Sequence, residues 1–199
     1  MKHQSLFELK RKLFHILGGI LGIFLIQFNL INTRIIFSVL VFGIILSIIC
    51  LKHRVPIISS FLDTFGRKEE QEHLPGRALI FAAAGVLLCL QLFEKNIALA
   101  SLIILTFSDS TSLLVGKYLG KTKTILNKEK NIEGTIAGVL VSTSLASFFV
   151  PFYLAFIGSL AAGFFELLTI RVQELKVDDN LIIPLSAGTI MFLVQMFLI

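Results

Sequence analysis

The chain alternates between long apolar runs and short polar segments. Seven apolar runs can be drawn, at residues 13–30, 35–51, 78–93, 97–116, 135–150, 152–170 and 181–199. Each has about the 17–25 residues that a membrane-spanning helix requires, once the polar flanks of the shortest runs are counted. A single helix over 135–170 would be about 54 Å long, against a hydrocarbon core of about 30 Å. We therefore expect Pro151 to turn a tight hairpin, within one all-α membrane bundle of about seven helices that occupies residues 1–199.

Composition and charge support a membrane protein and predict its orientation. Apolar residues make up 55% of the chain and charged residues 16%, which is more apolar and less charged than an ordinary soluble domain. Sixteen of the 18 lysines and arginines fall in alternate polar segments, and only Arg34 and Lys95 lie on the opposite side. The positive-inside rule then places the N-terminus in the cytoplasm and the C-terminus outside. Because the excess positive charge reflects topology and no basic helix carries interleaved aromatics, we expect no nucleic-acid partner.

Unusual polar residues gather at the predicted cytoplasmic ends of the apolar runs. His15, Asp109 and Glu166 lie inside runs, and Asp179 and Asn180 immediately precede the last one. A carboxylate at membrane depth is costly and marks a functional site by default. On this argument Asp109→Asn should abolish activity, and the neutral side chain could even raise the heat stability. A site at headgroup depth suits a reaction between a soluble charged reagent and a membrane lipid.

Helical spacing predicts which faces of these helices meet. Asp109, Ser112 and Gly116 recur at i, i+3 and i+7, and Glu166 ends a four-residue repeat of small residues. A second repeat begins at Gly134. Small residues let helices approach closely in lipid, so the two carboxylates are expected to point into the bundle.

Each candidate residue also has a plain structural interpretation. Asp109 suits Mg²⁺, which binds one or two carboxylates together with substrate phosphates, but neighbouring hydroxyls could instead satisfy it. The lysines of segment 117–130 could neutralise phosphates, or could simply flank a membrane helix. Glu133 and Asp179 could complement helix dipoles. His15 could move a proton, touch phosphate or reach the membrane interface.

Five motifs, in order, resemble a known family of membrane lipid kinases. Residues 8–15, Glu-Leu-Lys-Arg-Lys-Leu-Phe-His, resemble the opening Glu-x-x-Arg-Lys-x-x-His signature of dolichol kinases, phytol kinases and CTP-dependent diacylglycerol kinases. Residues 109–120 resemble the family's Asp-x-x-Ala-x-x-x-Gly-Arg-x-x-Gly element, with Ser112 for the usual Ala and Lys117 for the usual Arg. The other matches are residues 67–70 with Pro75-Gly76, residues 130–138 around Glu133-Gly134, and Glu166 with Asp179-Asn180 and Pro184.

The resemblance implies CTP as phosphoryl donor, Mg²⁺ dependence and a lipid alcohol as acceptor at the cytoplasmic face. It implies that Asp109, with Glu133 or Asp179, holds Mg²⁺, and that His15 or Glu166 assists the lipid hydroxyl. The implied substrate-binding residues are Arg11, Lys12, Ser112, Gly116, Lys117, Gly120, Lys121, Lys130, Gly134 and Asn180. Polyprenol, phytol-like alcohols and diacylglycerol all remain possible acceptors, and the oligomeric state is open.

Two other functions compete with a lipid kinase. A phosphatidate cytidylyltransferase shares the Asp109 and Glu133 elements but would release pyrophosphate, and the chain lacks that family's terminal Lys-Arg…Lys-Asp signature. An ion-coupled transporter would use Asp109 and Glu166 at the midplane, whereas the polar residues crowd one face and no inverted repeat is evident. Segment 56–65, with apolar Ile58, Phe61 and Phe65, fits an interfacial helix that feeds lipid to the site, or a simple loop.

Overall fold

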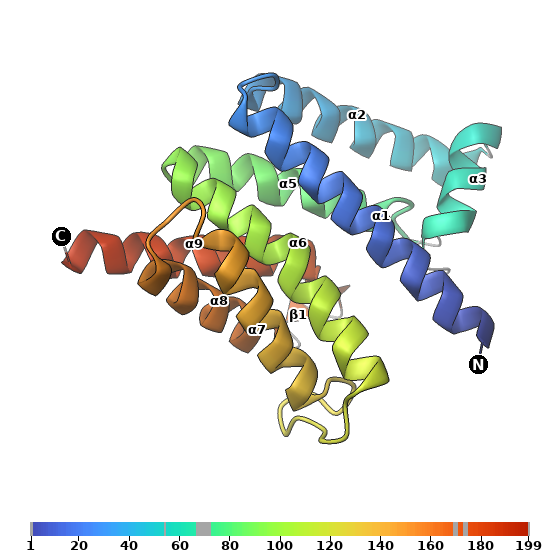
Figure 1. Cartoon of the computed structure of the whole chain (residues 1–199). Coiled ribbons are helices and arrows are strands. Elements are labelled where there is room, and N and C mark those ends of the chain that lie inside the picture. The colour runs from blue at the N-terminus through green and yellow to red at the C-terminus, as the bar shows by residue number, and fades with distance from the viewer. Residues whose placement is uncertain (1, 54, 67–72, 169–170, 173–174, 199) are drawn as a thin grey trace.

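The chain folds into a bundle of α-helices. The computed structural model describes residues 2–198 except for 54, 67–72, 169–170 and 173–174, so the motif at 67–70 lies outside the described residues. The helices are α1 Lys2–Gln27, α2 Thr33–Lys52, α3 Pro56–Phe65, α5 Arg77–Leu92, α6 Lys95–Tyr118, α7 Ile132–Ala146, α8 Phe152–Leu167 and α9 Asp179–Leu198 (Figure 1). Two short strands, β1 Arg171–Val172 and β2 Leu175–Lys176, pair antiparallel between α8 and α9. The predicted all-α membrane bundle is confirmed.

Each of the seven predicted apolar runs coincides over most of its length with one of the long helices, and segment 56–65 forms the amphipathic helix α3. Three helices, α2, α6 and α9, are long and apolar enough to cross a membrane by length and composition, and α5, α7 and α8 are apolar but shorter. Helix α1 begins well before the apolar run, because its basic segment 10–12 continues the helix without a break. The chain turns between α7 and α8 at residues 147–151, close to the predicted hairpin at Pro151.

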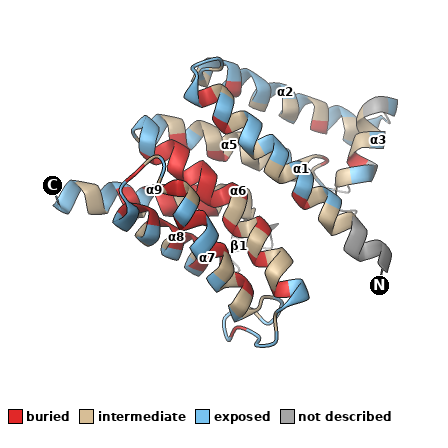
Figure 2. Cartoon of the chain, in the orientation of Figure 1, coloured by how far each residue is buried: buried red, intermediate tan, exposed pale blue. Residues whose placement is uncertain are grey.

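Helix α6 forms the centre of the bundle. All residues from Ile97 to Thr106 are buried, and Figure 2 shows this first half of α6 in red between its neighbours. It packs against α1, α5, α7, α8 and α9, whereas α2 packs on α5, and α3 lies against α1. The stretch is apolar all round, as a helix enclosed on every side must be. Asp109 lies further along α6, three residues after the end of this buried stretch.

The small residues predicted to bring helices together do so between α6 and α7. A Cβ atom at Gly138 would lie 2.8 Å from the Ser108 carbonyl oxygen, and one at Gly134 would collide with the Ser112 carbonyl oxygen. Only glycine therefore allows this separation of the two helices. The close approach places the start of α7, and the loop before it, beside the end of α6.

The outside of the bundle is apolar, as expected for a surface in contact with lipid. Large hydrophobic side chains are exposed on many helices, among them Phe42 on α2, Phe164 on α8 and Phe197 on α9. The N-terminus and the C-terminus lie on opposite sides of the molecule (Figure 1). This arrangement is compatible with an odd number of membrane crossings.

The charge distribution predicts which side each end occupies. A reporter fused after Ile199 should register the outside, and the same reporter inserted in loop 121–130 should register the cytoplasm, because 16 of 18 basic residues lie on the loop's side. A paired alkaline phosphatase and fluorescent-protein fusion at each position measures this directly. A C-terminus that reports the cytoplasm would contradict the orientation and remove one crossing.

Candidate active site

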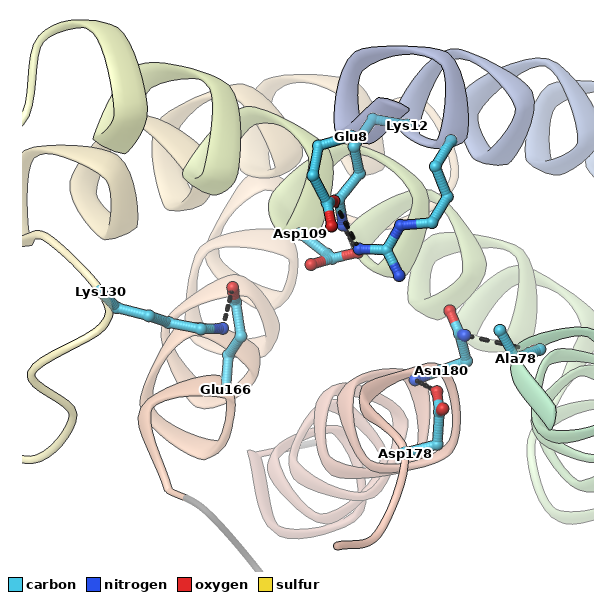
Figure 3. Close-up of polar contacts among 9 residues, drawn as sticks. Glu8, Lys12, Ala78, Asp109, Lys130, Glu166, Asp178 and Asn180 are labelled. Carbon is cyan, nitrogen blue, oxygen red and sulfur yellow. Dashed lines mark hydrogen bonds and ion pairs between the residues drawn. The ribbon is translucent and has the colours of Figure 1, made fainter. Parts of the chain in front are cut away.

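Asp109 on α6 forms an ion pair with Lys12 on the N-terminal helix α1. The Lys12 ammonium donates a hydrogen bond to Asp109 Oδ2, and Lys12 is only 5% exposed (Figure 3). Helix α1 can reach α6 here because Gly19 lies against Thr106, where a Cβ atom would fall 2.6 Å from Thr106 Cγ2. Lys12 lies seven residues before Gly19, two turns along the same face of α1. The contact of Gly19 with Thr106 thus positions the ammonium over the carboxylate.

A second ion pair joins the loop before α7 to the end of α8. Lys130 Nζ lies 2.5 Å from Glu166 Oε1, and the Glu166 side chain is 2% exposed (Figure 3). The other carboxylate oxygen, Oε2, is buried without a hydrogen-bond partner. Burial by itself would lower the pKa of Lys130. The attraction of the nearby carboxylates of Glu166, Asp179 and Asp109 is stronger and raises that pKa above its ordinary value. Lys130 therefore remains a cation throughout the neutral range.

The glycines of the 109–120 element shape the loop that carries Lys130. The Asn131 side-chain amide donates a hydrogen bond to the Gly116 carbonyl oxygen. A Cβ atom at Gly120 would collide with that amide, so glycine is required for the loop to close onto the end of α6. Backbone bonds from Ile132 N to Thr122 O and from Thr124 N to Lys130 O, both 3.0 Å, hold the two sides of the loop together.

Glu133 has a different place from the one implied for a magnesium ligand. Its carboxylate accepts hydrogen bonds from the Thr122 backbone amide, at 3.0 and 3.3 Å, and it is not among the residues that line the polar cavity described below. These hydrogen bonds connect the start of the loop, at Thr122, to the first turn of α7.

A polar cavity of about 750 Å³ lies at this end of the bundle. The sequence-predicted residues that line it are Arg11, Lys12, Asp109, Ser112, Gly116, Lys117, Gly120, Lys121, Lys130, Glu166, Asp179 and Asn180. Gly134 and His15 are not among its lining residues. Arg77, Asn127 and Asn131 also line it. The sequence alone assigned no role to these three. Arg77 entered only the count of basic residues, Asn131 lies in the 130–138 motif but at no implied site position, and Asn127 lies in no motif.

The beginning of α9 is attached to the beginning of α5 at the edge of this cavity. Asn180 Nδ2 donates a hydrogen bond of 3.2 Å to the Ala78 carbonyl oxygen, and Arg77 Nε lies 3.9 Å from Asp178 Oδ2. A Cβ atom at Gly85 would meet the Asn180 carbonyl oxygen, so the two helices pack closely there. These contacts place Asp179 on the cavity wall, where it interacts electrostatically with Lys130 and Glu166.

An apolar cavity of about 560 Å³ adjoins the polar one. It lies between α1, α2, α3, α5 and α6 and is lined mainly by aliphatic, glycine and phenylalanine residues. The residues that line both cavities are Arg11, Lys12, Ala78, Asp109 and Asn180. His15 lines only the apolar cavity, and its Nε2 atom is buried without a hydrogen-bond partner. The Lys12–Asp109 pair therefore lies at the boundary between the polar cavity and the apolar cavity.

The carboxylates of the polar cavity fit a magnesium ion that is held largely by phosphate. Asp109, Glu166 and Asp179 supply hard oxygen donors in one cavity. Over the part of the chain that the structure describes, no three acidic, histidine or cysteine side chains converge tightly enough to form a protein cage for a metal. Mg²⁺ does not need such a cage, because it commonly uses one or two carboxylates with substrate phosphates and water.

Comparison with known proteins places the chain in a family. It is 31% identical to the Uncharacterized protein RP860 of Rickettsia prowazekii, over 90% of this chain and 91% of that protein. The chain belongs to the RP860 family. It is also 28% identical to the Uncharacterized protein MJ1137 of Methanocaldococcus jannaschii, over 89% of this chain and 88% of that protein.

The chain is also similar, more distantly, to a protein whose name states an enzymatic activity. CTP-dependent diacylglycerol kinase 1 of Schizosaccharomyces pombe is 25% identical over 63% of this chain and 64% of its own length. No family model and no solved structure matches the chain. The distant similarity supports membership in a broader group of lipid kinases, in agreement with the resemblance of the sequence motifs.

Proposed function

We propose that the protein is a CTP-dependent kinase that phosphorylates the hydroxyl group of a membrane lipid alcohol. The observation that carries this proposal is the boundary at Asp109 between the polar and the apolar cavity. A transfer between a soluble nucleotide and a lipid needs two such chambers that meet at the reacting atoms. The distant similarity to a CTP-dependent diacylglycerol kinase supports CTP as the nucleotide and an alcohol as the acceptor.

The polar cavity suits a triphosphate. Lys117, Lys121 and Lys130 line it from the α6 end and the following loop, and Arg11 and Lys12 line it from α1. Phosphoryl transfer requires mainly that charge be neutralised and that the reactants be positioned. The lysines now paired with Asp109 and Glu166 can turn to phosphate oxygens, which leaves the carboxylates for the metal. Asp109 and Asp179 would hold Mg²⁺, which supplies further neutralisation of the phosphates when bound.

At phosphorus the reaction forms one bond and breaks one. The lipid hydroxyl oxygen bonds to the γ-phosphorus of CTP, and the bond from that phosphorus to the β,γ-bridging oxygen breaks. The proton of the hydroxyl group is released to water in the polar cavity. CDP leaves with the electron pair of the broken bond, and the product is a lipid phosphate. The cavity boundary at Asp109 is where the γ-phosphoryl group and the hydroxyl would meet. By the charge distribution, this boundary faces the cytoplasm, where CTP is present.

Labelled nucleotide distinguishes the proposed reaction from its main competitor. Protein in detergent with Mg²⁺ and γ-labelled CTP should transfer the label to an organic-extractable lipid from a panel of diacylglycerol, polyprenol and phytol-like alcohols. CTP labelled at the α-phosphate should leave the lipid unlabelled and yield labelled CDP. If the α-label instead enters the lipid when phosphatidate is supplied, the protein is a cytidylyltransferase and the kinase proposal fails.

A further inference from the structure

We propose that the acceptor lipid binds along α1, with its hydroxyl group on His15 Nε2 and its chain over the open glycine face of Gly18 and Gly22. This inference rests on the proposed kinase function and assigns the acceptor site within it. It also decides between His15 and Glu166, which sequence reasoning leaves as alternatives for the residue that meets the lipid hydroxyl.

His15 has an unmet hydrogen-bonding atom in the apolar cavity. It lies one turn after Lys12 on the cavity side of α1, and its Nε2 is buried with no partner in the structure. It interacts electrostatically with both Asp109 and Lys12, so it lies close to the boundary of the two cavities. A buried polar atom without a partner costs free energy unless a ligand supplies one. A lipid hydroxyl that enters through the apolar cavity is such a ligand.

Glu166 faces the nucleotide side instead. It lines the polar cavity and not the apolar one, and one of its oxygens is held by Lys130 at 2.5 Å. Figure 3 shows the Lys130–Glu166 pair set apart from the Lys12–Asp109 pair across the site. The two candidates thus belong to different substrates, and only His15 can contact an acceptor that occupies the apolar cavity.

The glycines after His15 divide between packing and open space. Gly19 lies against Thr106 and brings α1 onto α6, but a Cβ atom at Gly18 or Gly22 would meet nothing within 4 Å. Both of these glycines line the apolar cavity, with Ala82 and Ala83 of α5 among the other lining residues. Small side chains usually let two helices touch, whereas here they leave a channel between α1 and α5. The channel starts at His15 and follows the helix away from the polar cavity.

The chemistry of the channel identifies its occupant as a neutral lipid with a hydroxyl head. The charged residues that line the apolar cavity are Arg11, Lys12 and Asp109, all at the boundary with the polar cavity. Apart from the polar side chains of His15, Thr106 and Asn180, the rest of the wall is aliphatic, aromatic or glycine. Phe14, Phe61 and Phe65 pack on one another where α3 meets α1. One polar end and one long apolar wall fit an alcohol attached to a hydrocarbon chain.

Filling the channel tests where the chain lies. Gly22→Leu adds a side chain into space that the protein leaves open, so the fold should tolerate it, and kcat/KM for the lipid should fall roughly tenfold or more. Leu21→Phe is the matched control, because Leu21 is 58% exposed on α1 and lines neither cavity. CTP binding, measured by equilibrium dialysis with labelled CTP, should stay unchanged in both variants. Equal losses in Gly22→Leu and Leu21→Phe would overturn the proposed channel.

Replacing the histidine tests where the hydroxyl lies. His15→Leu removes the acceptor atom and should lower lipid phosphorylation about 10- to 100-fold with CTP binding intact, since one hydrogen bond is lost. His15→Gln keeps an acceptor and should recover part of the loss. If both variants phosphorylate lipid like the wild type, His15 does not bind the hydroxyl. A wild-type protein that transfers no label from CTP to any lipid alcohol would instead refute the proposed function itself.

Discussion

Asp109→Asn should reduce transfer of the γ-phosphoryl group from CTP to lipid by roughly 100- to 1,000-fold, the loss typical when one electrostatic contributor to a transition state is removed. Asparagine keeps the shape of the side chain but not the charge that Mg²⁺ and the Lys12 ammonium both require. The rate of label transfer at saturating CTP and Mg²⁺ measures the effect. Near-wild-type turnover under these conditions would make Asp109 a purely structural residue.

The structure also reverses an expectation for the stability of this variant. From the sequence alone, removing a charge from the membrane could raise heat stability. Asp109 is paired with Lys12, however, and Lys12 is 5% exposed, so the variant leaves a buried ammonium without its counterion. Asp109→Asn should therefore melt at a lower temperature than the wild type. Adding Lys12→Met should restore the melting temperature without restoring activity.

Ser110→Ala is the matched control for Asp109→Asn. Ser110 is the next residue on α6, its hydroxyl is buried without a hydrogen-bond partner, and it lines neither cavity. Its replacement should leave both lipid phosphorylation and the melting temperature close to wild type. A comparable loss of activity in Ser110→Ala would attribute the Asp109 effect to disturbance of the helix.

Lys130→Met should cause the largest loss of stability, toward the lower end of the about 3–5 kcal/mol that is typical when a buried ion pair loses one member, because the Lys130 side chain is itself 22% exposed. Glu166, with a side chain 2% exposed and one oxygen already unpartnered, would keep a buried carboxylate without its paired cation. Lipid phosphorylation should fall as well, because Lys130 is one of the cations proposed to hold the triphosphate. Melting of the purified protein in detergent, followed by size-exclusion chromatography, measures the stability change.

Two further variants separate the contributions of Lys130. Lys130→Met with Glu166→Gln removes both charges and should recover most of the lost stability, yet it should remain poorly active. Lys128→Met removes a lysine of the same loop that is exposed and lines neither cavity, and it should behave like the wild type. A single Lys130→Met variant as stable as Lys128→Met would show that the ion pair does not support the fold.

The sequence predicted the helices and the polar end of the bundle well, because both depend on local patterns. Apolar runs and their polar breaks define the helices, and helical spacing correctly turned Asp109 and Glu166 toward the interior. Most of the implied substrate-binding residues line one cavity, since each motif lies at the same end of its helix. The motifs did not predict which charged residues pair across the bundle.

That pairing depends on contacts between distant segments. Lys12 meets Asp109 only because Gly19 packs on Thr106, which nothing in the two motifs indicates. Glu133 was implied as a metal ligand because it stands beside Gly134 in a motif, but the hydrogen bond from the Thr122 amide turns it toward the loop. The apolar cavity was invisible for a similar reason. The same glycine pattern on α1 is compatible either with tight helix packing or with an open channel. The position of α5 determines which of the two occurs.

The unequal lengths of the apolar helices affect the bilayer around the molecule. Helices α5, α7 and α8 have 15 or 16 residues, which corresponds to a rise of about 22–24 Å, less than the thickness of a typical hydrocarbon core. Hydrophobic mismatch of this kind is relieved by local thinning of the bilayer. Because α7 and α8 pack together against α6, we expect the thinning to be concentrated there, and we expect the protein to favour thinner membranes than its longer helices alone would select.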